Sequence, residues 1–215
     1  MVHSYKIILS IIVLALISNN TFSQENNFEG ELLYDFHFHD KTGKMSDFDS
    51  RRIMGNEQSY LFKGNKYKSE MNGEMNFTQF YHGGDTLYFS MNNTNAIFYT
   101  NSSNPDDTVI SFNIKKEGKI IGAYACDLLE IISDAGITSY YFSNSLKTNP
   151  TFFKSHKKGL WSFFMEKTNG CLPVKIIADY KGSKTEILLK RVERRIVDNL
   201  YFEIPKGLPI IEDSN

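Results

Sequence analysis

The sequence lacks the local motifs that usually mark an enzyme or a nucleotide-binding protein. It contains no G-x-S-x-G nucleophile elbow, no H-E-x-x-H zinc motif, no phosphate-binding P-loop and, after residue 23, no dinucleotide-binding G-x-G-x-x-G. A nucleophile assembled from distant residues stays open, because catalytic triads are defined by geometry. We therefore expect a protein that is not an enzyme and that needs no cofactor or metal.

Long apolar runs and an excess of charge are also missing. After residue 23 no stretch is long and apolar enough for a membrane-spanning helix. The 24 Lys and Arg nearly balance the 25 Asp and Glu, so nothing indicates a nucleic-acid partner. The 17 Phe and 12 Tyr, together with Ile, Val and Thr, favour strands over helices.

Residues 1–23 have the pattern of a cleaved export signal. Lys6 supplies a basic start, residues 7–17 form an apolar run whose single polar member is Ser10, and residues 21–23 give a cleavage site. A helix of that run would reach roughly 16 Å, about half of a hydrocarbon core, so an uncleaved anchor is the weaker interpretation. We expect an exported protein of the periplasm or cell envelope, or a secreted one, with residues 24–215 as a single domain.

Cysteine is scarce, with Cys126 and Cys171 as the two in the chain. In an oxidising compartment they are candidates for a disulfide, which would close a loop of about 45 residues and contribute roughly 3 to 4 kcal/mol. The alternative is a pair of buried thiols that pack as small hydrophobic side chains.

Short strands separated by Gly-rich and Asn-rich turns are expected along most of the chain. Residues 41–55 are polar and indicate a loop or an excursion at the edge of the sheet. A turn is expected at Glu117-Gly118, and a bulge or bend at Gly122. The pattern predicts one large antiparallel sheet, with strands at residues 28–39, 59–62, 66–71, 75–81, 86–91, 96–100, 109–115, 119–133 and 137–142.

Residues 170–207 are expected to form three consecutive antiparallel strands, the third at residues 199–205. A two-residue loop at Gly182-Ser183 joins the first two strands and sets their register. Counting back from this loop places one set of side chains on a common apolar face, with Tyr180 opposite Thr185, Ala178 opposite Ile187 and Ile176 opposite Leu189.

Residues 158–168 are the best helix candidate after the signal. Leu160, Phe163 and Phe164 follow helical spacing, so we expect this helix to lie against the sheet. Lysines and aromatic residues gather just before this helix and in its first turn, and they indicate either contact with an anionic membrane surface or the solvated side of an amphipathic segment. These are Lys154, Lys157, Lys158, Phe152, Phe153 and Trp161.

Asp35, His37 and His39 alternate along the first strand and therefore share one face. Two imidazoles and a carboxylate at this spacing are able to bind a metal such as zinc. Because alternating polarity is the ordinary outcome for a half-exposed antiparallel strand, we favour a solvated face.

Several sequence segments carry a family resemblance. They are F-E-G-E at residues 28–31, K-G-N-K-Y-K-S-E-M at 63–71, I-G-A-Y-A-C at 121–126, G-C-L-P-V-K-I at 170–176 and Y-F-E-I-P-K-G at 201–207. In this order they resemble an exported family of unknown function, which is similar in turn to the periplasmic lipoprotein carriers of the LolA and LolB type. The resemblance implies an incomplete barrel, made of one strongly bent sheet whose apolar concave face is covered by helices and holds lipid chains.

We therefore expect a mostly β protein, an α+β fold with one large curved antiparallel sheet and one or two helices on its concave face. The expected function is non-catalytic binding of a lipid or a lipoprotein acyl chain inside the half-barrel. The alternative is an interaction module for another cell-envelope protein, with a packed core and no ligand. The predicted lining consists of Ile176, Ala178, Tyr180, Ile187, Leu189 and Phe202, with Phe163 and Phe164 as a lid.

Overall fold

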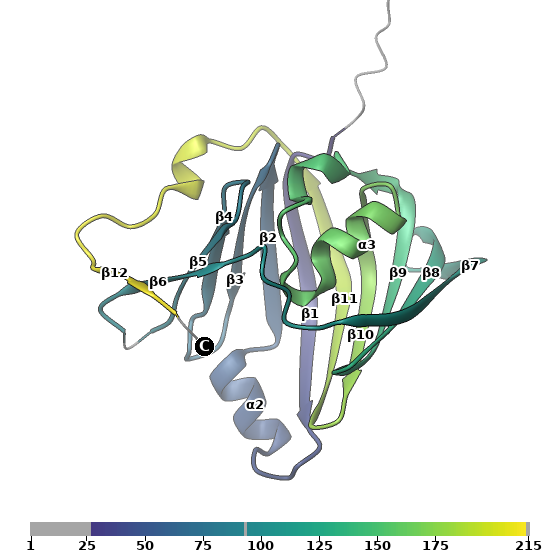
Figure 1. The fold of residues 1–215 in the computed structure, drawn as a ribbon, viewed down its shortest axis with the longest axis horizontal. Coiled ribbons are helices and arrows are strands. Elements are labelled where there is room, and N and C mark those ends of the chain that lie inside the picture. Colours follow the sequence, from purple (N-terminus) through teal and green to yellow (C-terminus); the bar gives the residue numbers. More distant parts are fainter. Residues whose placement is uncertain (1–26, 93, 214–215) are drawn as a thin grey trace, which may run out of the picture.

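The computed structural model describes residues 27–92 and 94–213, and a single twelve-stranded sheet dominates them (Figure 1). The predicted export signal, residues 1–23, lies outside the described residues. The strand order across the sheet is β12-β6-β5-β4-β3-β2-β1-β11-β10-β9-β8-β7. The strands are β1 (Gly30–Asp40), β2 (Glu57–Lys63), β3 (Lys66–Met71), β4 (Thr78–Tyr81), β5 (Thr86–Ser90), β6 (Ile97–Asn101), β7 (Val109–Ile121), β8 (Tyr124–Ser133), β9 (Gly136–Lys147), β10 (Cys171–Tyr180), β11 (Ser183–Arg194) and β12 (Ile210–Glu212).

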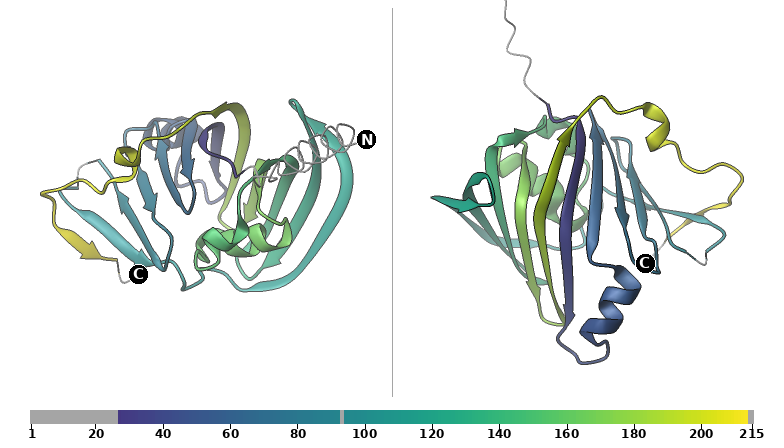
Figure 2. Two further views of the ribbon diagram at one scale, coloured as in Figure 1. Left: turned by 90° about the horizontal axis from the view of Figure 1, so that it is seen from above. Right: turned by 180° about the vertical axis from the view of Figure 1, so that it is seen from behind.

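The sheet curves strongly and stays open. β1 lies near its middle, with β2 to β6 on one wing and β11 to β7 on the other. Seen from above in Figure 2, the two wings bend around the helical segment, and the end strands β7 and β12 stay far apart. The prediction of a mostly β, incomplete barrel is confirmed. The sheet is mixed rather than wholly antiparallel, because β12 runs parallel to β6.

The concave face is covered by the segment between β9 and β10. This segment holds two short 3-10 helices, Pro150–Phe153 and Lys158–Leu160, followed by the helix α3 (Trp161–Lys167). The helix expected at residues 158–168 is thus confirmed as a 3-10 turn followed by an α-helix. The crossover from β6 to β7 runs beside this cover, since the backbone amide of Lys157 donates to the carbonyl of Ser102 at 2.7 Å.

The main core lies between this cover and the sheet. Phe153, Phe164 and Met165 are fully buried there, and they meet inward-facing residues from both wings, such as Phe62 and Leu129. Burial of such side chains contributes roughly 1.5 to 3 kcal/mol each, so the cover is held mainly by apolar packing.

The segment 41–55, expected as a loop, contains a helix, α2 (Asp47–Met54). Ser46 caps its start, because its side chain accepts a hydrogen bond from the backbone amide of Asp49 at 3.0 Å. Gly55 ends the helix at a φ of 92°. The loop prediction was wrong because end caps and charges, rather than an apolar stripe, define this helix.

Two predicted turns are corrected. Glu117-Gly118, expected as a turn, lies within β7, where the register shifts between Lys115 and Lys119. The β7–β8 hairpin turns after Ile121, so Gly122, expected as a bulge or bend, lies in the turn. In the β10–β11 hairpin, Ala178 pairs with Thr185 and Ile176 with Ile187, two residues away from the predicted register. Because side chains alternate with period two, an even shift leaves each one on its predicted face.

The third strand expected at residues 199–205 is replaced by a 3-10 helix, Asn199–Phe202. Asp198 starts it by accepting a hydrogen bond from the amide of Leu200 at 3.0 Å, a local bond that competes with strand pairing. Among the described residues, no helix has both the length and the apolar character needed to cross a membrane.

Candidate functional site

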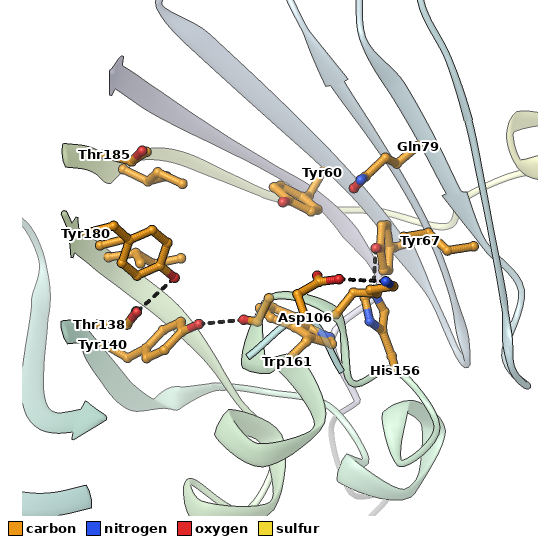
Figure 3. Close-up of a pocket in the computed structure, with 16 residues that line it drawn as sticks. Tyr60, Tyr67, Gln79, Asp106, Thr138, Tyr140, His156, Trp161, Tyr180 and Thr185 are labelled. Carbon is orange, nitrogen blue, oxygen red and sulfur yellow. Dashed lines mark hydrogen bonds and ion pairs between the residues drawn. The ribbon is translucent and has the colours of Figure 1, made fainter. Parts of the chain in front are cut away.

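The concave face of the sheet contains a pocket of about 400 Å³, which lies within the usual size range of small-molecule sites (Figure 3). Both wings of the sheet and the cover contribute to it. Its lining consists of Tyr60, Tyr67, Gln79, Leu87, Asp106, Thr138, Tyr140, His156, Lys158, Gly159, Trp161, Ile176, Ala178, Tyr180, Thr185 and Ile187.

One wall of the pocket is formed by the β10–β11 hairpin. Ile176 and Ala178 of β10 face the pocket together with their partners across the ladder, Ile187 and Thr185. The intervening Ile177 points to the opposite face, as the alternation of a strand requires. This wall is predominantly apolar and offers surface rather than hydrogen bonds.

Two tyrosines close the same wing. Tyr180 and Thr138 share a hydrogen bond between their hydroxyl oxygens at 3.2 Å. Tyr140 donates its hydroxyl to the carbonyl of Gly159 at 3.0 Å, and its ring stacks on Phe164 with 4.4 Å between the centroids. Tyr140 therefore fastens the cover to the sheet at the edge of the pocket.

The other wall comes from β2 and β3. Gln58 donates its amide to the hydroxyl of Tyr60 at 3.1 Å, which satisfies that hydroxyl inside the protein. Burial raises the pKa of both Tyr60 and Tyr67 above the ordinary value of 10.0. Both phenols are therefore neutral at physiological pH, and the wall carries no charge.

His156 connects the cover to this second wall. Its Nε2 and the hydroxyl of Tyr67 lie 2.7 Å apart in a hydrogen bond, and its ring lies 4.8 Å from that of Tyr81. Burial lowers the pKa of His156 to about 4. An imidazole of such low basicity is poorly matched to general-base catalysis near pH 7, for which a pKa close to the working pH is best.

An ion pair marks the polar side of the pocket. Lys158 donates to Asp106 at 2.6 Å, with 18% of the lysine side chain and 50% of the aspartate side chain exposed. Figure 3 shows Asp106 on the same side of the pocket as His156. The pair brings opposite charges together, so the pocket carries little net charge.

Trp161, the sole tryptophan of the chain, lines both this pocket and a small cavity beside it. The cavity has a volume of about 20 Å³, and its other walls include Tyr34, Phe62 and Pro173. The indole Nε1 is buried and has no hydrogen-bond partner among the described residues. This small, largely apolar cavity therefore lies next to the open pocket, beside the indole ring of Trp161.

The predicted lining residues divide into three groups. Ile176, Ala178, Tyr180 and Ile187 line the pocket. Leu189 packs against the core beside it, and Phe164 is fully buried beneath the cover. The other two lie elsewhere. Phe163 packs against Phe112 of β7, with 5.3 Å between the ring centroids, and Phe202 packs with Leu61 and Val197 on the face opposite Tyr60.

Cys126 and Cys171 are buried free thiols, which is the alternative to the predicted disulfide. They lie on β8 and β10, and β9 runs between these strands. Two strand spacings amount to roughly 9.6 Å, whereas a disulfide needs Cα atoms within about 7 Å. Burial raises the pKa of Cys171 to about 11, so this thiol is unreactive.

Two further interpretations of the sequence, a metal site on the first strand and a membrane-contacting lysine-aromatic segment, can be compared with the structure. Asp35 pairs with Lys190 and His39 with Asp47, and within residues 27–92 and 94–213 no group of metal-binding side chains is gathered. Phe153 is fully buried, while Phe152 and Trp161 pack against the core. These three rings point inward and Lys154 and Lys157 are exposed, so the solvated-side interpretation fits these two lysines, whereas Lys158 lies at the pocket and pairs with Asp106.

No local sequence pattern indicates Asp106, Lys158 and His156 as pocket residues, because the crossover and the cover bring them together over long separations in the chain. Alternation along their strands is a signal that Tyr60, Tyr67 and Tyr140 face inward. It does not indicate which wing of the sheet each one belongs to, or which residue each one hydrogen-bonds. Trp161 stands three positions before Phe164 on α3, a spacing that indicates a shared helix face.

The fold and the pocket define a class: a mostly β protein with an open, curved sheet, a helical cover and a largely aromatic hollow between them. No family model matches the sequence, and no curated protein matches it either. Among solved structures, the fold matches a LolA superfamily protein from Nitrosomonas europaea with a TM-score of 0.38 and 10% sequence identity. That match covers 83% of this chain and 91% of the other. Likeness at this level does not define what this chain binds.

Proposed function

We propose that this protein is exported to the cell envelope and binds an apolar ligand, a lipid or an acyl chain, in the hollow of its half-barrel without catalysing a reaction. The observation that carries the proposal is the pocket of about 400 Å³ between the cover and the concave face. Export rests on the signal pattern of residues 1–23.

The chemistry of the pocket supports an apolar guest. Ile176, Ala178 and Ile187 provide aliphatic surface, and the hydroxyls of Tyr60, Tyr140 and Tyr180 already have hydrogen-bond partners inside the protein. Because these hydroxyls need no polar group from a ligand, the affinity depends on the apolar area that the ligand buries. Each buried methylene contributes about 0.8 kcal/mol, so a dozen methylenes supply about 10 kcal/mol before the costs of association. Micromolar affinity corresponds to about 8 kcal/mol, so the costs of association determine the chain length at which it is reached.

The test is a calorimetric titration of the purified protein with dodecanoate, using two matched variants on β10. Ala178→Phe fills the pocket, whereas Ile177→Phe places the same ring on the opposite face of the same strand. The loss of two buried methylenes weakens binding more than tenfold, at about 0.8 kcal/mol each, so we expect at least that loss for Ala178→Phe and little change for Ile177→Phe. No binding by the unaltered protein, or an equal loss in both variants, contradicts the proposal.

The rival function is a protein interaction module of the cell envelope. One observation favours it, namely the row of exposed apolar side chains on the end strand β7. A surface of this kind is compatible with a ligand pocket elsewhere, so the two functions do not exclude each other.

A further inference from the structure

The end strand β7 is unusually exposed. It is the last strand of the sheet, and within the described parts of the chain no strand pairs with its outer edge. Every residue from 110 to 120 is exposed, and four of them are large and apolar. These are Ile110 at 68%, Phe112 at 46%, Ile114 at 40% and Ile120 at 70% exposure.

Proteins usually protect such edges with charges, bulges or short strands. β7 carries register shifts near both ends, between Val109 and Ser111 and between Lys115 and Lys119. The stretch between them, Ser111 to Lys115, pairs regularly with β8 and has no charge before Lys115. This stretch therefore leaves outward backbone groups unpaired within the described residues, flanked by the apolar side chains of Phe112 and Ile114, and such an edge is a template for another strand.

The charges around this stretch indicate which strand fits. Asp106 and Asp107 lie just before the regularly paired stretch of β7, whereas Lys115 and Lys116 lie at the end of that stretch, in the middle of the strand. A stretch that is acidic at one end and basic at the other complements itself when a second copy runs antiparallel to it. A parallel copy would place like charges together, which destabilises a strand pair.

We propose that two copies of this chain associate through their β7 strands, antiparallel, about a two-fold axis at Ser111. In this register Phe112 faces Ile110 of the second copy and Lys115 faces Asp107, and each contact occurs twice. Partial burial, together with Asp134 and Asp106, raises the pKa of Asp107, so an incoming lysine also relieves acidic crowding there. The pairing joins two twelve-stranded sheets into one and leaves each pocket in its own half-barrel.

Symmetry distinguishes this arrangement from open-ended assembly. Pairing of β7 with itself is closed, because the same edge is used by both partners. Pairing of β7 with the opposite end strand β12 would leave free edges and grow into filaments, and β12 offers three residues. We therefore expect dimers and no larger species.

The test combines mass and cross-linking on the full protein. Sedimentation should show a concentration-dependent dimer. Ser111→Cys should form an intermolecular disulfide under mild oxidation, because residues paired across antiparallel strands have Cα atoms about 4.5 to 5.5 Å apart, within disulfide range. Lys181→Cys, at the exposed tip of the β10–β11 hairpin, is the control and should not cross-link.

A charge exchange tests the register. Lys115→Glu opposes Asp107 twice in each dimer, so we expect the dissociation constant to rise about tenfold. Adding Asp107→Lys to Lys115→Glu restores the opposite charges and should return it to the original value. A protein that stays monomeric, assembles without limit, or forms a dimer unaffected by these changes overturns the proposal.

Discussion

At the scale of single residues, His156 makes the stability of the protein depend on pH. Burial holds its pKa at about 4, below the value of 6.5 expected in the unfolded chain. Between these values the unfolded chain binds more protons, so the free energy of unfolding falls as pH falls through this window. For His156 this loss amounts to about 2 kcal/mol between pH 7 and about pH 5.

Urea unfolding of the unaltered protein and of His156→Gln at both pH values measures this effect. Glutamine retains hydrogen-bonding groups near Tyr67 but does not titrate. We expect the difference in unfolding free energy between the two proteins to shrink by about 2 kcal/mol at the lower pH. A difference that stays constant with pH would show that His156 is not held neutral by burial.

Tyr34 provides a second test at this scale. Its hydroxyl donates to the carbonyl of Pro173 at 2.9 Å in a buried contact across the sheet. Tyr34→Phe leaves that carbonyl without this partner, which costs about 1 to 3 kcal/mol of unfolding free energy. Tyr201→Phe removes a hydroxyl from a ring that is 50% exposed and should change stability little. Equal effects of the two variants would contradict this account.

At the scale of elements, the turn into α3 is the strained part of the cover. Gly159 and Leu160 have φ angles of 59° and 61°, in the left-handed region that costs a side chain about 1 to 2 kcal/mol. The carbonyl of Gly159 accepts the hydroxyl of Tyr140, so this turn also fixes the edge of the pocket.

Gly159→Ala should therefore destabilise the protein by about 1 kcal/mol, because a Cβ there meets open space and only the backbone angle opposes it. Gly182→Ala is the matched control, since Gly182 lies in a turn but does not have positive φ. We expect no loss of stability there. Thermal unfolding of both variants makes the comparison, and equal melting temperatures would refute the assignment of strain.

Local sequence patterns predicted some of these elements correctly and failed for others. Alternation in β10 and β11 was enough to place Ile176, Ala178, Tyr180 and Ile187 on the pocket face, even though the predicted pairing register was off by two residues. Alternation failed for Phe202, because the hydrogen bond from Leu200 to Asp198 converts an apparently alternating segment into a 3-10 helix. The helix α2 was missed because its signal lies in its caps, Ser46 and Gly55.

At the scale of the whole molecule, one large sheet was predictable from many short strands, and its strongly bent, open form was expected from the family resemblance. The completed site was not. Asp106 and Lys158 meet at 2.6 Å across 52 positions, and Tyr67 meets His156 across 89. Such contacts depend on the crossover and the cover, whose paths no local periodicity specifies. The pocket is therefore a property of topology, built from walls that the sequence partly revealed.

The most direct test of ligand binding uses Trp161, the sole tryptophan, as an intrinsic probe at the pocket wall. Its fluorescence is followed while saturated fatty acids of increasing length are added to the purified protein. We expect saturable changes, with affinity rising about fourfold per added methylene, at about 0.8 kcal/mol each, until the pocket is full. An emission spectrum unchanged by any chain, or an affinity independent of chain length, would contradict the proposal that the half-barrel holds an apolar guest.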